Sequence, residues 1–402
     1  MRWRVSLRAA GLVVVLAAAV QLHAGVMYTI TDLGTLGGTY SYARGINDRG
    51  QVVGSSERGG DYAEHAFRTA PNQPINPMTD DLGTLAGKTY SQAYGINNLG
   101  QVVGWSGSLP NGVDARAFRT GPNQAINRGT DGLGTLGGSR SFAYAINDVG
   151  EVVGESSLAG DDEPHEFWGH AFRTGPNLPI NPSTDNLGTL GGRSSAAYGI
   201  NDAGQVAGSA LTADAKWHGF RTGPNSAIVP LSDDIGTLGG WGSIANAITA
   251  SGHVAGTADP APEQPGFPAP IHIFRTDRNR RIDPATDDLG AIGSGSPTVL
   301  GMNDGGDIVG WYFAAPDYDH MRAFVCFGSS LFDLNELIEP VPGLVLEVAS
   351  DINNLGQIVV SGNLNGQSRA FRLDPVPEPS GILLFSLGLV VAFGRRPRTM
   401  AA

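Results

Sequence analysis

Apolar residues occur in short runs separated by turn residues, and the same pattern returns about every fifty residues. One unit has four such runs: Ser91–Ile96, Gln101–Gly104, Arg116–Thr120 and Leu133–Leu136. Each run has the length of a β-strand, and runs with helical periodicity do not occur in this unit. The pattern therefore predicts a repeat unit of four short strands.

The number of units follows from one apolar residue that precedes a polar turn in every copy. These marker residues are Ile46, Ile96, Ile146, Ile200, Ile248, Met302 and Ile352. They are 50, 50, 54, 48, 54 and 50 residues apart. Regular spacing of this size is typical of a repeat architecture, in which each unit buries its apolar faces against its neighbours.

The turn after the marker has the chemistry of a tight hairpin. In the second unit it reads Asn97-Asn98-Leu99-Gly100, and in the fifth unit Thr249 replaces the first Asn. Asn closes local turns with its side chain, and Gly supplies a positive φ. Small residues such as Ala93 and Gly95 recur at alternate positions of the strand before the turn, and therefore on one face of it. This predicts an innermost strand that is crowded near a central axis.

The two ends of the repeat region predict closure of a ring. A strand of the fourth type, Tyr28–Leu36, precedes the first hairpin, whereas the last hairpin is followed only by its third strand, Arg369–Leu373. The N-terminal strand can therefore complete the seventh sheet and remove the open end of the array. We predict a seven-bladed β-propeller, with an open β-solenoid as the alternative. In the sixth unit, Asp333–Leu337 stands in place of the fourth run.

Composition supports an all-β protein and restricts its partners. The chain has 58 Gly and 25 Pro, and its one cysteine, Cys326, excludes an internal disulfide. Six of the basic residues lie at the two ends of the chain: Arg2, Arg4, Arg8, Arg395, Arg396 and Arg398. The rest of the chain has 20 basic and 38 acidic residues and is therefore strongly negative. This balance argues against nucleic acid and against an anionic lipid surface as partners.

The first 24 residues have the features of a secretory signal peptide. Arg2, Arg4 and Arg8 precede an apolar stretch over 11–20, and a small residue, Ala24, ends the segment. A charged start, a short apolar stretch and a small residue predict cleavage after Ala24. An uncleaved anchor is the alternative.

The repeat pattern stops after Asp374, and a different segment follows at 375–402. It contains the motif Val376-Pro377-Glu378-Pro379-Ser380, an apolar stretch at 381–394 and the basic cluster Arg395, Arg396 and Arg398. Fourteen residues of helix reach about 21 Å, which is short of the roughly 30 Å of hydrocarbon in a bilayer. We therefore expect transient contact with the inner membrane through 381–394, with the basic cluster held on the cytoplasmic side as a stop-transfer signal.

The units resemble the HAF repeats of bacterial extracellular proteins, which are named for the run found here at His65-Ala66-Phe67 and His170-Ala171-Phe172. The run Asp32–Gly38, which recurs in several units, accompanies this motif. The resemblance covers residues 26–374 and implies export and a repeat fold, but it carries no assigned activity.

The C-terminal segment resembles a PEP-CTERM sorting signal, with Pro377-Glu378-Pro379 as its motif. This resemblance implies processing by the membrane transpeptidase exosortase in a Gram-negative bacterium. It also implies delivery to the cell surface or the biofilm matrix.

Several patterns that could carry chemistry have a structural explanation. His165 and His170 are five residues apart, which does not suit a helical zinc motif, and the repeat histidines His65, His218 and His272 are expected in strands. The Asn/Asp turns lack the spacing of a calcium loop, so we predict neither metal nor cofactor. The Arg that follows each motif Phe, such as Arg68, is expected to pair with the Asp that starts the fourth run of its own blade, such as Asp81.

These observations predict a non-enzymatic scaffold that binds extracellular polysaccharide or surface proteins. The variable connections between the second and third strands, such as 107–112, are its expected binding loops. The alternative is a propeller glycosidase or lyase. Its candidate carboxylates are the Asp residues that recur in the turns: Asp48, Asp148, Asp202 and Asp304.

Overall fold

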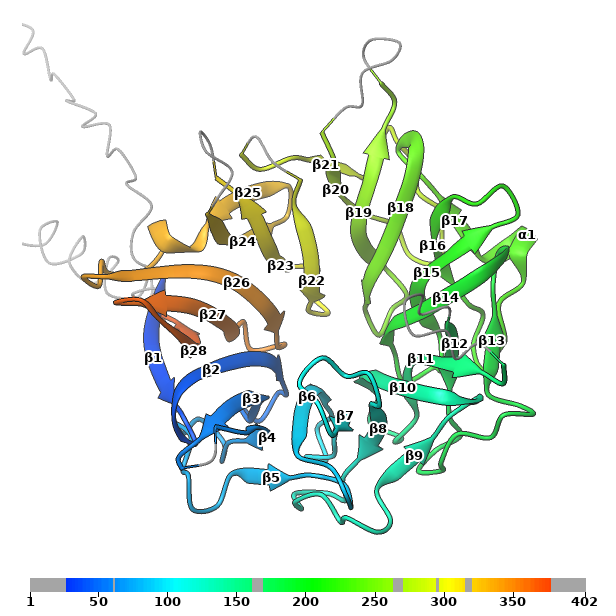
Figure 1. Cartoon of the computed structure of the whole chain (residues 1–402). Coiled ribbons are helices and arrows are strands. Elements are labelled where there is room, and N and C mark those ends of the chain that lie inside the picture. The colour runs from blue at the N-terminus through cyan, green and yellow to red at the C-terminus, as the bar shows by residue number, and fades with distance from the viewer. Residues whose placement is uncertain are drawn as a thin grey trace, which may run out of the picture.

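The computed structural model describes residues 27–60, 62–160, 169–262, 270–293, 296–314 and 320–376, which form seven four-stranded sheets around a central axis (Figure 1). Neighbouring strands in each sheet are antiparallel, and in six of the sheets the strands follow chain order from the axis outward. This is a seven-bladed β-propeller, as the repeat pattern predicts.

The first three blades contain the following strands: β2 (Gly37–Ile46), β3 (Val52–Arg58), β4 (Glu64–Arg68) and β5 (Asp81–Gly83); β6 (Tyr90–Ile96), β7 (Val102–Gly107), β8 (Arg116–Arg119) and β9 (Gly132–Gly134); β10 (Gly137–Ile146), β11 (Val152–Leu158), β12 (Gly169–Arg173) and β13 (Asn186–Gly188). The next two contain β14 (Gly191–Ile200), β15 (Val206–Thr212), β16 (Trp217–Arg221) and β17 (Asp234–Gly236); β18 (Gly239–Ile248), β19 (Val254–Pro260), β20 (His272–Arg275) and β21 (Asp288–Gly290). A short helix, α1 (Pro230–Asp233), precedes β17.

The sixth blade contains β22 (Thr298–Met302), β23 (Ile308–Phe313), β24 (Met321–Phe327) and β25 (Ser330–Asp333). Its fourth strand therefore ends where the expected run begins, and a 3-10 helix, Leu334–Glu336, follows. The seventh blade contains β26 (Leu344–Ile352), β27 (Ile358–Leu364), β28 (Gln367–Pro375) and, from the other end of the chain, β1 (Tyr28–Gly34).

The N-terminal strand closes the ring, as predicted. Strand β1 pairs antiparallel with β28, so that Thr31 lies opposite Arg372 and Asp32 opposite Phe371. The open-solenoid alternative is wrong, because the first and last repeat strands share one sheet. In addition, the backbone N–H of Val376 donates to the Met27 carbonyl at 2.8 Å. The two ends of the described ring therefore lie side by side.

Two faces of the ring are distinguished by their connections. The turn face carries the hairpin turns between the first and second strands, such as Asn47–Gly50, and the loop face carries the connections between the second and third strands, such as 108–115. In the first turn, Asn47 Oδ1 accepts the N–H groups of Arg49 and Gln51, and Gly50 adopts a φ of +72°. The predicted turn chemistry is therefore confirmed.

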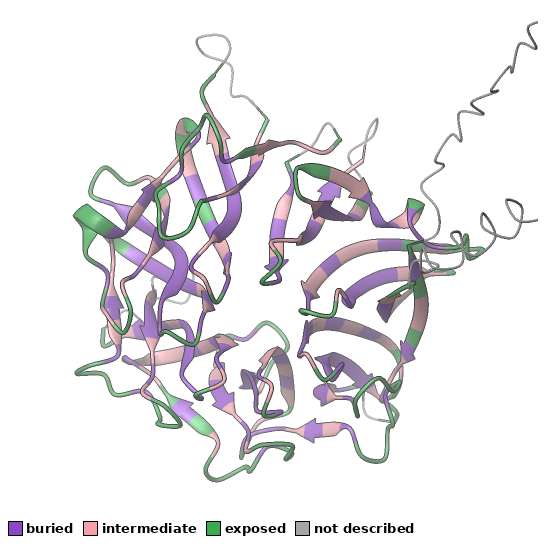
Figure 2. Ribbon diagram, turned by 180° about the vertical axis from the view of Figure 1, so that it is seen from behind, coloured by how far each residue is buried: buried purple, intermediate pink, exposed green. Residues whose placement is uncertain are grey.

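The hydrophobic core lies between the blades. Seven clusters of buried apolar residues are present among the described residues, and each is formed by two adjacent blades. Figure 2 shows the buried positions along the strands and the exposed ones in the outer loops. The Phe of each third strand is at most 2% exposed: Phe67, Phe118, Phe172, Phe220, Phe274, Phe324 and Phe371. Cys326 of the sixth blade is also buried.

Small residues let the blades approach at the axis. A Cβ on Gly45 of β2 would lie 2.9 Å from the Tyr94 carbonyl oxygen of the next blade. A buried serine joins the same blades, because Ser91 Oγ accepts the Ala66 N–H at 2.9 Å and donates to the Gly83 carbonyl at 2.7 Å. The Ala of the repeat motif and the Gly of the fourth strand thus share one contact between blades.

Candidate functional site at the axial channel

The channel along the axis holds a cavity at each end. The cavity on the turn face has a volume of about 250 Å³ and is lined by all seven marker residues and by the turns that follow them. The cavity on the loop face has a volume of about 190 Å³, and five of the same marker residues line it. The ring of Ile and Met side chains therefore lies between the two cavities.

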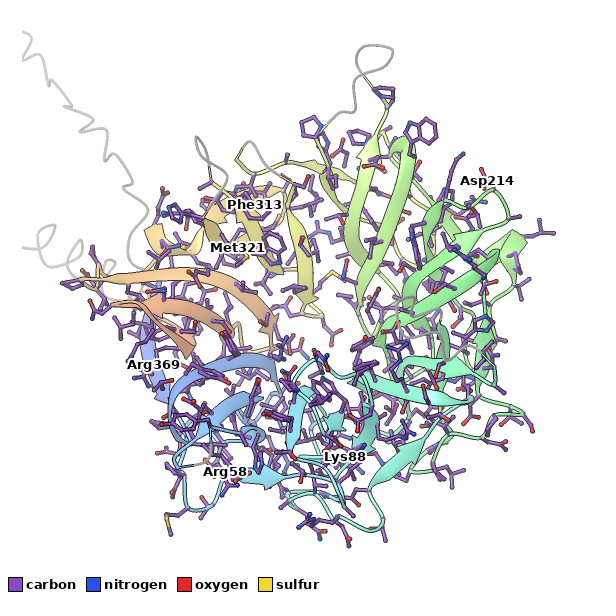
Figure 3. The ribbon with its side chains drawn as sticks, viewed as in Figure 1. Arg58, Lys88, Asp214, Phe313, Met321 and Arg369 are labelled. Carbon is purple, nitrogen blue, oxygen red and sulfur yellow. The ribbon has the colours of Figure 1, made fainter. Side chains whose placement is uncertain are left out.

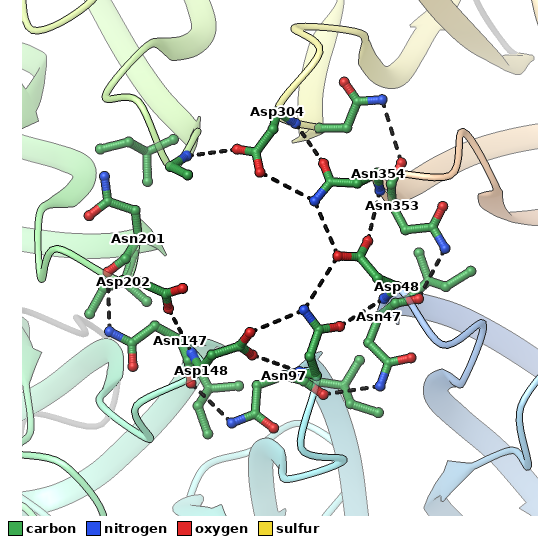
Figure 4. Close-up of a pocket in the computed structure, with 18 of the residues that line it drawn as sticks. Asn47, Asp48, Asn97, Asn147, Asp148, Asn201, Asp202, Asp304, Asn353 and Asn354 are labelled. Atoms are coloured by element: carbon green, nitrogen blue, oxygen red, sulfur yellow. Dashed lines mark hydrogen bonds between the residues drawn. The ribbon is translucent and has the colours of Figure 1, made fainter.

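The first Asn of each turn links neighbouring blades on the turn face (Figure 4). Asn47 Nδ2 donates to the Asn97 carbonyl at 3.0 Å, and Asn97 Nδ2 donates to the Asn147 carbonyl at 3.0 Å. The same bond closes the ring from Asn353 to the Asn47 carbonyl at 3.0 Å. Thr249 has no amide to donate, so this belt is interrupted after the fifth blade.

The second residue of the turn forms a second belt in six of the seven blades, the exception being Ala250 of the fifth. Its side-chain oxygen accepts the backbone N–H of the equivalent residue in the preceding blade, as in Asn98 N–H to Asp148 at 2.7 Å and Asp148 N–H to Asp202 at 2.9 Å. Asp304 accepts from Ala250 at 2.7 Å, and Asp48 accepts from Asn354 at 2.9 Å.

The structure thus brings Asp48, Asp148, Asp202 and Asp304 to one cavity, although they are far apart in sequence. Asn98 Nδ2 bridges Asp48 and Asp148 at 3.3 and 3.1 Å, so these carboxylates are close together. However, the lining of this cavity contains only Ile, Met, Ala, Asn and Asp. A sugar ring would find no aromatic side chain to stack on there, and the carboxylates already accept bonds that join the blades. The polar residues at this end of the channel are therefore best explained as two belts of hydrogen bonds that hold the ring closed.

The repeat histidines lie in strands and bind within their own blades, as expected. His65 Nδ1 lies 2.8 Å from Asp81 Oδ1, and His272 Nδ1 lies 2.9 Å from Asp288 Oδ1. His170 has the same contact with Asn186 at 3.0 Å. His165 lies outside the described residues. Within the described part of the chain, no group of three or more His, Cys, Asp or Glu side chains is arranged to hold a metal.

The expected pairing of the motif Arg with the Asp of its own blade is wrong. Arg68 Nη1 donates instead to two carbonyls of the next blade, Gly100 at 3.3 Å and Gln124 at 3.0 Å. Asp81 is held by His65 and by Arg58, whose Nε lies 3.2 Å from its carboxylate. The motif Arg therefore joins adjacent blades, as a staple between them. The Asp expected to pair with it interacts with the motif His instead.

The loop-face cavity has a different chemistry. It is lined by the residue two positions before each marker. This residue is Tyr in the second, third and fourth blades and differs in the other four. In blade order the seven are Arg44, Tyr94, Tyr144, Tyr198, Asn246, Leu300 and Ser350. Asp351 of β26 also lines it. Tyrosine thus occupies three adjacent blades, and polar or small apolar groups occupy the other side.

An array of aromatic rings leads outward from this cavity. The Tyr144 ring lies 5.5 Å from that of Tyr94 and 5.7 Å from that of Tyr198. Phe142 stacks near Tyr144 at 6.4 Å, and Trp105 meets Phe142 edge to face at 6.0 Å. These separations are typical of favourable aromatic pairs. We call these five residues the aromatic array; it extends over the second, third and fourth blades.

Polar groups accompany the array. The Arg44 guanidinium lies 4.6 Å from the centre of the Tyr94 ring. Burial raises the pKa of the Asp351 carboxyl to about 7, although the Ile46 N–H donates to it at 3.0 Å. Burial also raises the pKa of Glu155 to about 7, and Tyr144 Oη donates to this carboxyl at 2.6 Å.

Sequence reasoning missed the loop-face cavity. It used the small residues at one parity of the innermost strand, such as Ala93 and Gly95, and these are the residues packed between blades. The cavity is formed by the other parity, including Tyr94. The signal was present, because three successive units carry Tyr two positions before the marker, at Tyr94, Tyr144 and Tyr198.

The sorting predictions fall almost entirely outside the described residues. This applies to Ala24, to Pro377, Glu378, Pro379 and Ser380, to 381–394 and to Arg395, Arg396 and Arg398. Val376 is described and is 39% exposed. Within the described ranges, no helix has the length and apolar character needed to cross a bilayer.

Comparison with known proteins gives no family. No family model and no curated protein matches the chain. Similar solved structures include the WD40 β-propeller domain of Doa1, which is 14% identical over 87% of this chain and 98% of that chain, with a TM-score of 0.42. A mutant of AofleA from Arthrobotrys oligospora is 9% identical over 87% and 89% of the two chains, with a TM-score of 0.34. A protein of unknown function from Dyadobacter fermentans DSM 18053 is 12% identical over 86% and 99%, with a TM-score of 0.33.

Proposed function

We propose that this protein is an exported propeller that binds extracellular glycan without catalysis through its loop-face cavity. The observation that carries the proposal is the aromatic array, which is continuous with a cavity that also holds Arg44, Asn246 and Asp351. A sugar ring has apolar C–H faces and polar edges. Tyrosine rings offer flat surfaces on which the apolar faces can stack. Amide, guanidinium and carboxyl groups offer hydrogen bonds to the polar edges.

The shape of the site favours a glycan over a surface protein as the partner. A bound peptide commonly adds to an exposed strand edge or fills a long groove. Each innermost strand, such as β6, is an edge strand, but the space beside it is a cavity of about 190 Å³, which is smaller than the roughly 300–1,000 Å³ of drug-sized ligand sites. It suits one sugar unit.

We further propose that the chain is delivered to the cell surface or biofilm matrix as an exosortase substrate. The support is the sequence pattern at its two ends, with Ala24 as the signal cleavage residue and Pro377-Glu378-Pro379 as the sorting motif. In the ring, the Val376 N–H donates to the Met27 carbonyl, so the two ends of the described ring lie side by side at the seventh blade. These ends adjoin the outer strands β1 and β28 of that blade (Figure 1), whereas the cavity is lined by the innermost strands.

Mass spectrometry of protein recovered from the cell surface tests the sorting proposal. The expected mature chain begins near Gly25 and lacks Arg395, Arg396 and Arg398. Replacing Pro377 and Pro379 by Ala should leave the uncut chain in the inner membrane. Surface material that retains Arg395 would contradict this part of the proposal.

A glycan array probed with the full chain tests the binding proposal. Tyr94→Leu should lower the signal at least tenfold, because it removes a ring that faces both Arg44 and Tyr144. The matched control is Tyr62→Leu, which changes a side chain that is 78% exposed and does not line the cavity. Binding that is equal in the two variants would show that the aromatic array is not the binding site.

A propeller glycosidase or lyase is the second candidate. The turn-face residues Asp48 and Asp148 do not favour it, because no aromatic residue lines their cavity. The observation in its favour is at the loop-face end, where Asp351 lines the cavity and Glu155 accepts a hydrogen bond from the lining residue Tyr144. Burial raises the pKa of each carboxyl to about 7, which suits general acid–base chemistry. Shortening of the bound glycan during incubation, with loss of cleavage in Glu155→Gln, would establish this function in place of the scaffold.

A further inference from the structure

We infer that the loop-face cavity takes an acidic sugar residue whose carboxylate is bound by Arg44. This inference rests on the proposed glycan-binding function and names the class of glycan. It follows from three features of the cavity: a guanidinium without an acidic partner, an unpaired amide oxygen, and tyrosine rings on one wall.

Arg44 is the only charged residue among the seven that share its position in the repeat. Its guanidinium lies over the Tyr94 ring, and its Nε is shielded from water and has no hydrogen-bond partner. Within the described part of the chain, no carboxylate lies within ion-pairing distance of Arg44, whereas Arg58, Arg322 and Arg372 each have one. A buried donor of this kind normally has a partner, and a planar guanidinium binds a carboxylate with two parallel hydrogen bonds.

Asn246 supplies the complementary group. Its Oδ1 is also shielded from water without a hydrogen-bond partner, and it lines the same cavity as Arg44. An unpaired acceptor calls for a donor on the ligand, such as a sugar hydroxyl. A ligand that offers both a carboxylate and hydroxyl groups therefore complements both of these cavity side chains.

The tyrosine wall restricts the ligand further. Tyr94, Tyr144 and Tyr198 occupy one side of the cavity, and the Tyr144 ring lies 5.5 Å from that of Tyr94 and 5.7 Å from that of Tyr198. A small inorganic anion would pair with Arg44 but would leave these rings without a contact. A uronate uses both, because its pyranose ring can lie on tyrosine while its carboxylate reaches the guanidinium.

Asp351 is the group that could oppose an acidic ligand, and its hydrogen bonds reduce this effect. Its Oδ2 accepts the Ile46 N–H at 3.0 Å, and its Oδ1 accepts the Ile352 N–H at 2.9 Å. Both carboxylate oxygens are thus directed to backbone donors. Arg44, by contrast, has the Tyr94 ring beside its guanidinium but no carboxylate partner among the described residues.

Calorimetric titration of the full chain with matched sugars tests the inference. The probes are trisaccharides of galacturonate, mannuronate and glucuronate, each together with its methyl ester, which keeps the ring and removes the charge. We expect at least one uronate to bind, and its ester to bind at least tenfold more weakly. Arg44→Gln should lower the affinity for the acid at least tenfold and leave that for the ester unchanged.

The control is Arg369→Gln, which changes an arginine on the outer part of the ring (Figure 3) whose Nη2 bonds Gln367 at 2.9 Å. It should bind the acid as the wild type does. If Arg44→Gln fails to fold, Arg44→Lys retains the charge but loses the planar fork, and intermediate affinity is expected. Equal binding of acid and ester, or binding of neutral glycans only, overturns the acidic-sugar inference and leaves the glycan-binding function intact. Absence of binding to every uronate and every arrayed glycan overturns both.

Discussion

Replacing Gly154 by Ala should strongly destabilise the propeller. Gly154 is on the second strand of the third blade, opposite Ala143. A Cβ at this position would lie 1.9 Å from the Phe142 carbonyl oxygen and 2.9 Å from its carbonyl carbon. Since such contacts are not tolerated below about 3.0 Å, the two strands would have to separate by roughly 1 Å, against a normal spacing of about 4.8 Å.

The expected cost is at the upper end of the range for overpacking, about 3 kcal/mol, because backbone atoms cannot rotate away. Differential scanning calorimetry should show a fall in Tm of about 4 °C. The control is Gly129→Ala, where the nearest atom to the new Cβ is Asn127 Oδ1 at 3.9 Å and the residue is exposed. It should change stability by no more than about 0.5 kcal/mol. Equal melting of the two variants would refute the view that close strand approach selects glycine here.

Three further predictions concern charge and closure. Asp351→Asn should gain stability relative to the wild type as the pH rises from about 4 to 7. Burial raises the pKa of the Asp351 carboxyl in the folded protein from 3.8 to about 7. Ionisation of the wild-type carboxyl therefore opposes folding in that pH window, by at most roughly 4 kcal/mol. Urea unfolding of both proteins at pH 5 and pH 8 measures the difference in stability. Arg173→Met, which removes bonds to the Gly204 and Ser226 carbonyls of the next blade at 3.0 and 3.3 Å, should cost about 1–3 kcal/mol by the same assay, and an unchanged midpoint would contradict the staple. Leu33→Ala and Leu133→Ala remove equally buried side chains, 0% and 3% exposed, and each should cost about 2–5 kcal/mol. Only the former should also speed hydrogen exchange in β28, since only Leu33 lies on the closing strand.

Strand order and ring closure could be predicted from the sequence because they depend on local signals. Alternating polarity defines the strands, and the Asn and Gly of the turn at 47–50 define the hairpin. The surplus strand at the N-terminus and the missing one at the C-terminus then require that β1 join β28. Each of these inferences uses residues adjacent in the chain or a count of units.

Contacts between blades could not be predicted in the same way. Arg68 and Asp81 are closer in sequence than Arg68 and Gln124, yet Arg68 binds the Gln124 carbonyl. The spacing of the repeat does not specify whether a side chain at a strand end points within its blade or towards the next. The angle between adjacent sheets decides this, and it is a property of the closed ring.

The amino-acid sequence by itself determined seven units, four strands in each and a closing N-terminal strand, because turn chemistry and alternating burial act over a few residues. Only the tertiary structure decided which side chains meet at the axis. Tyr94, Tyr144 and Tyr198 come from successive units, each about fifty residues after the last, and Arg44 of the first blade lines the same cavity. They form one cavity because the ring places equivalent positions of adjacent blades side by side, with their polar and aromatic groups directed into the same narrow channel.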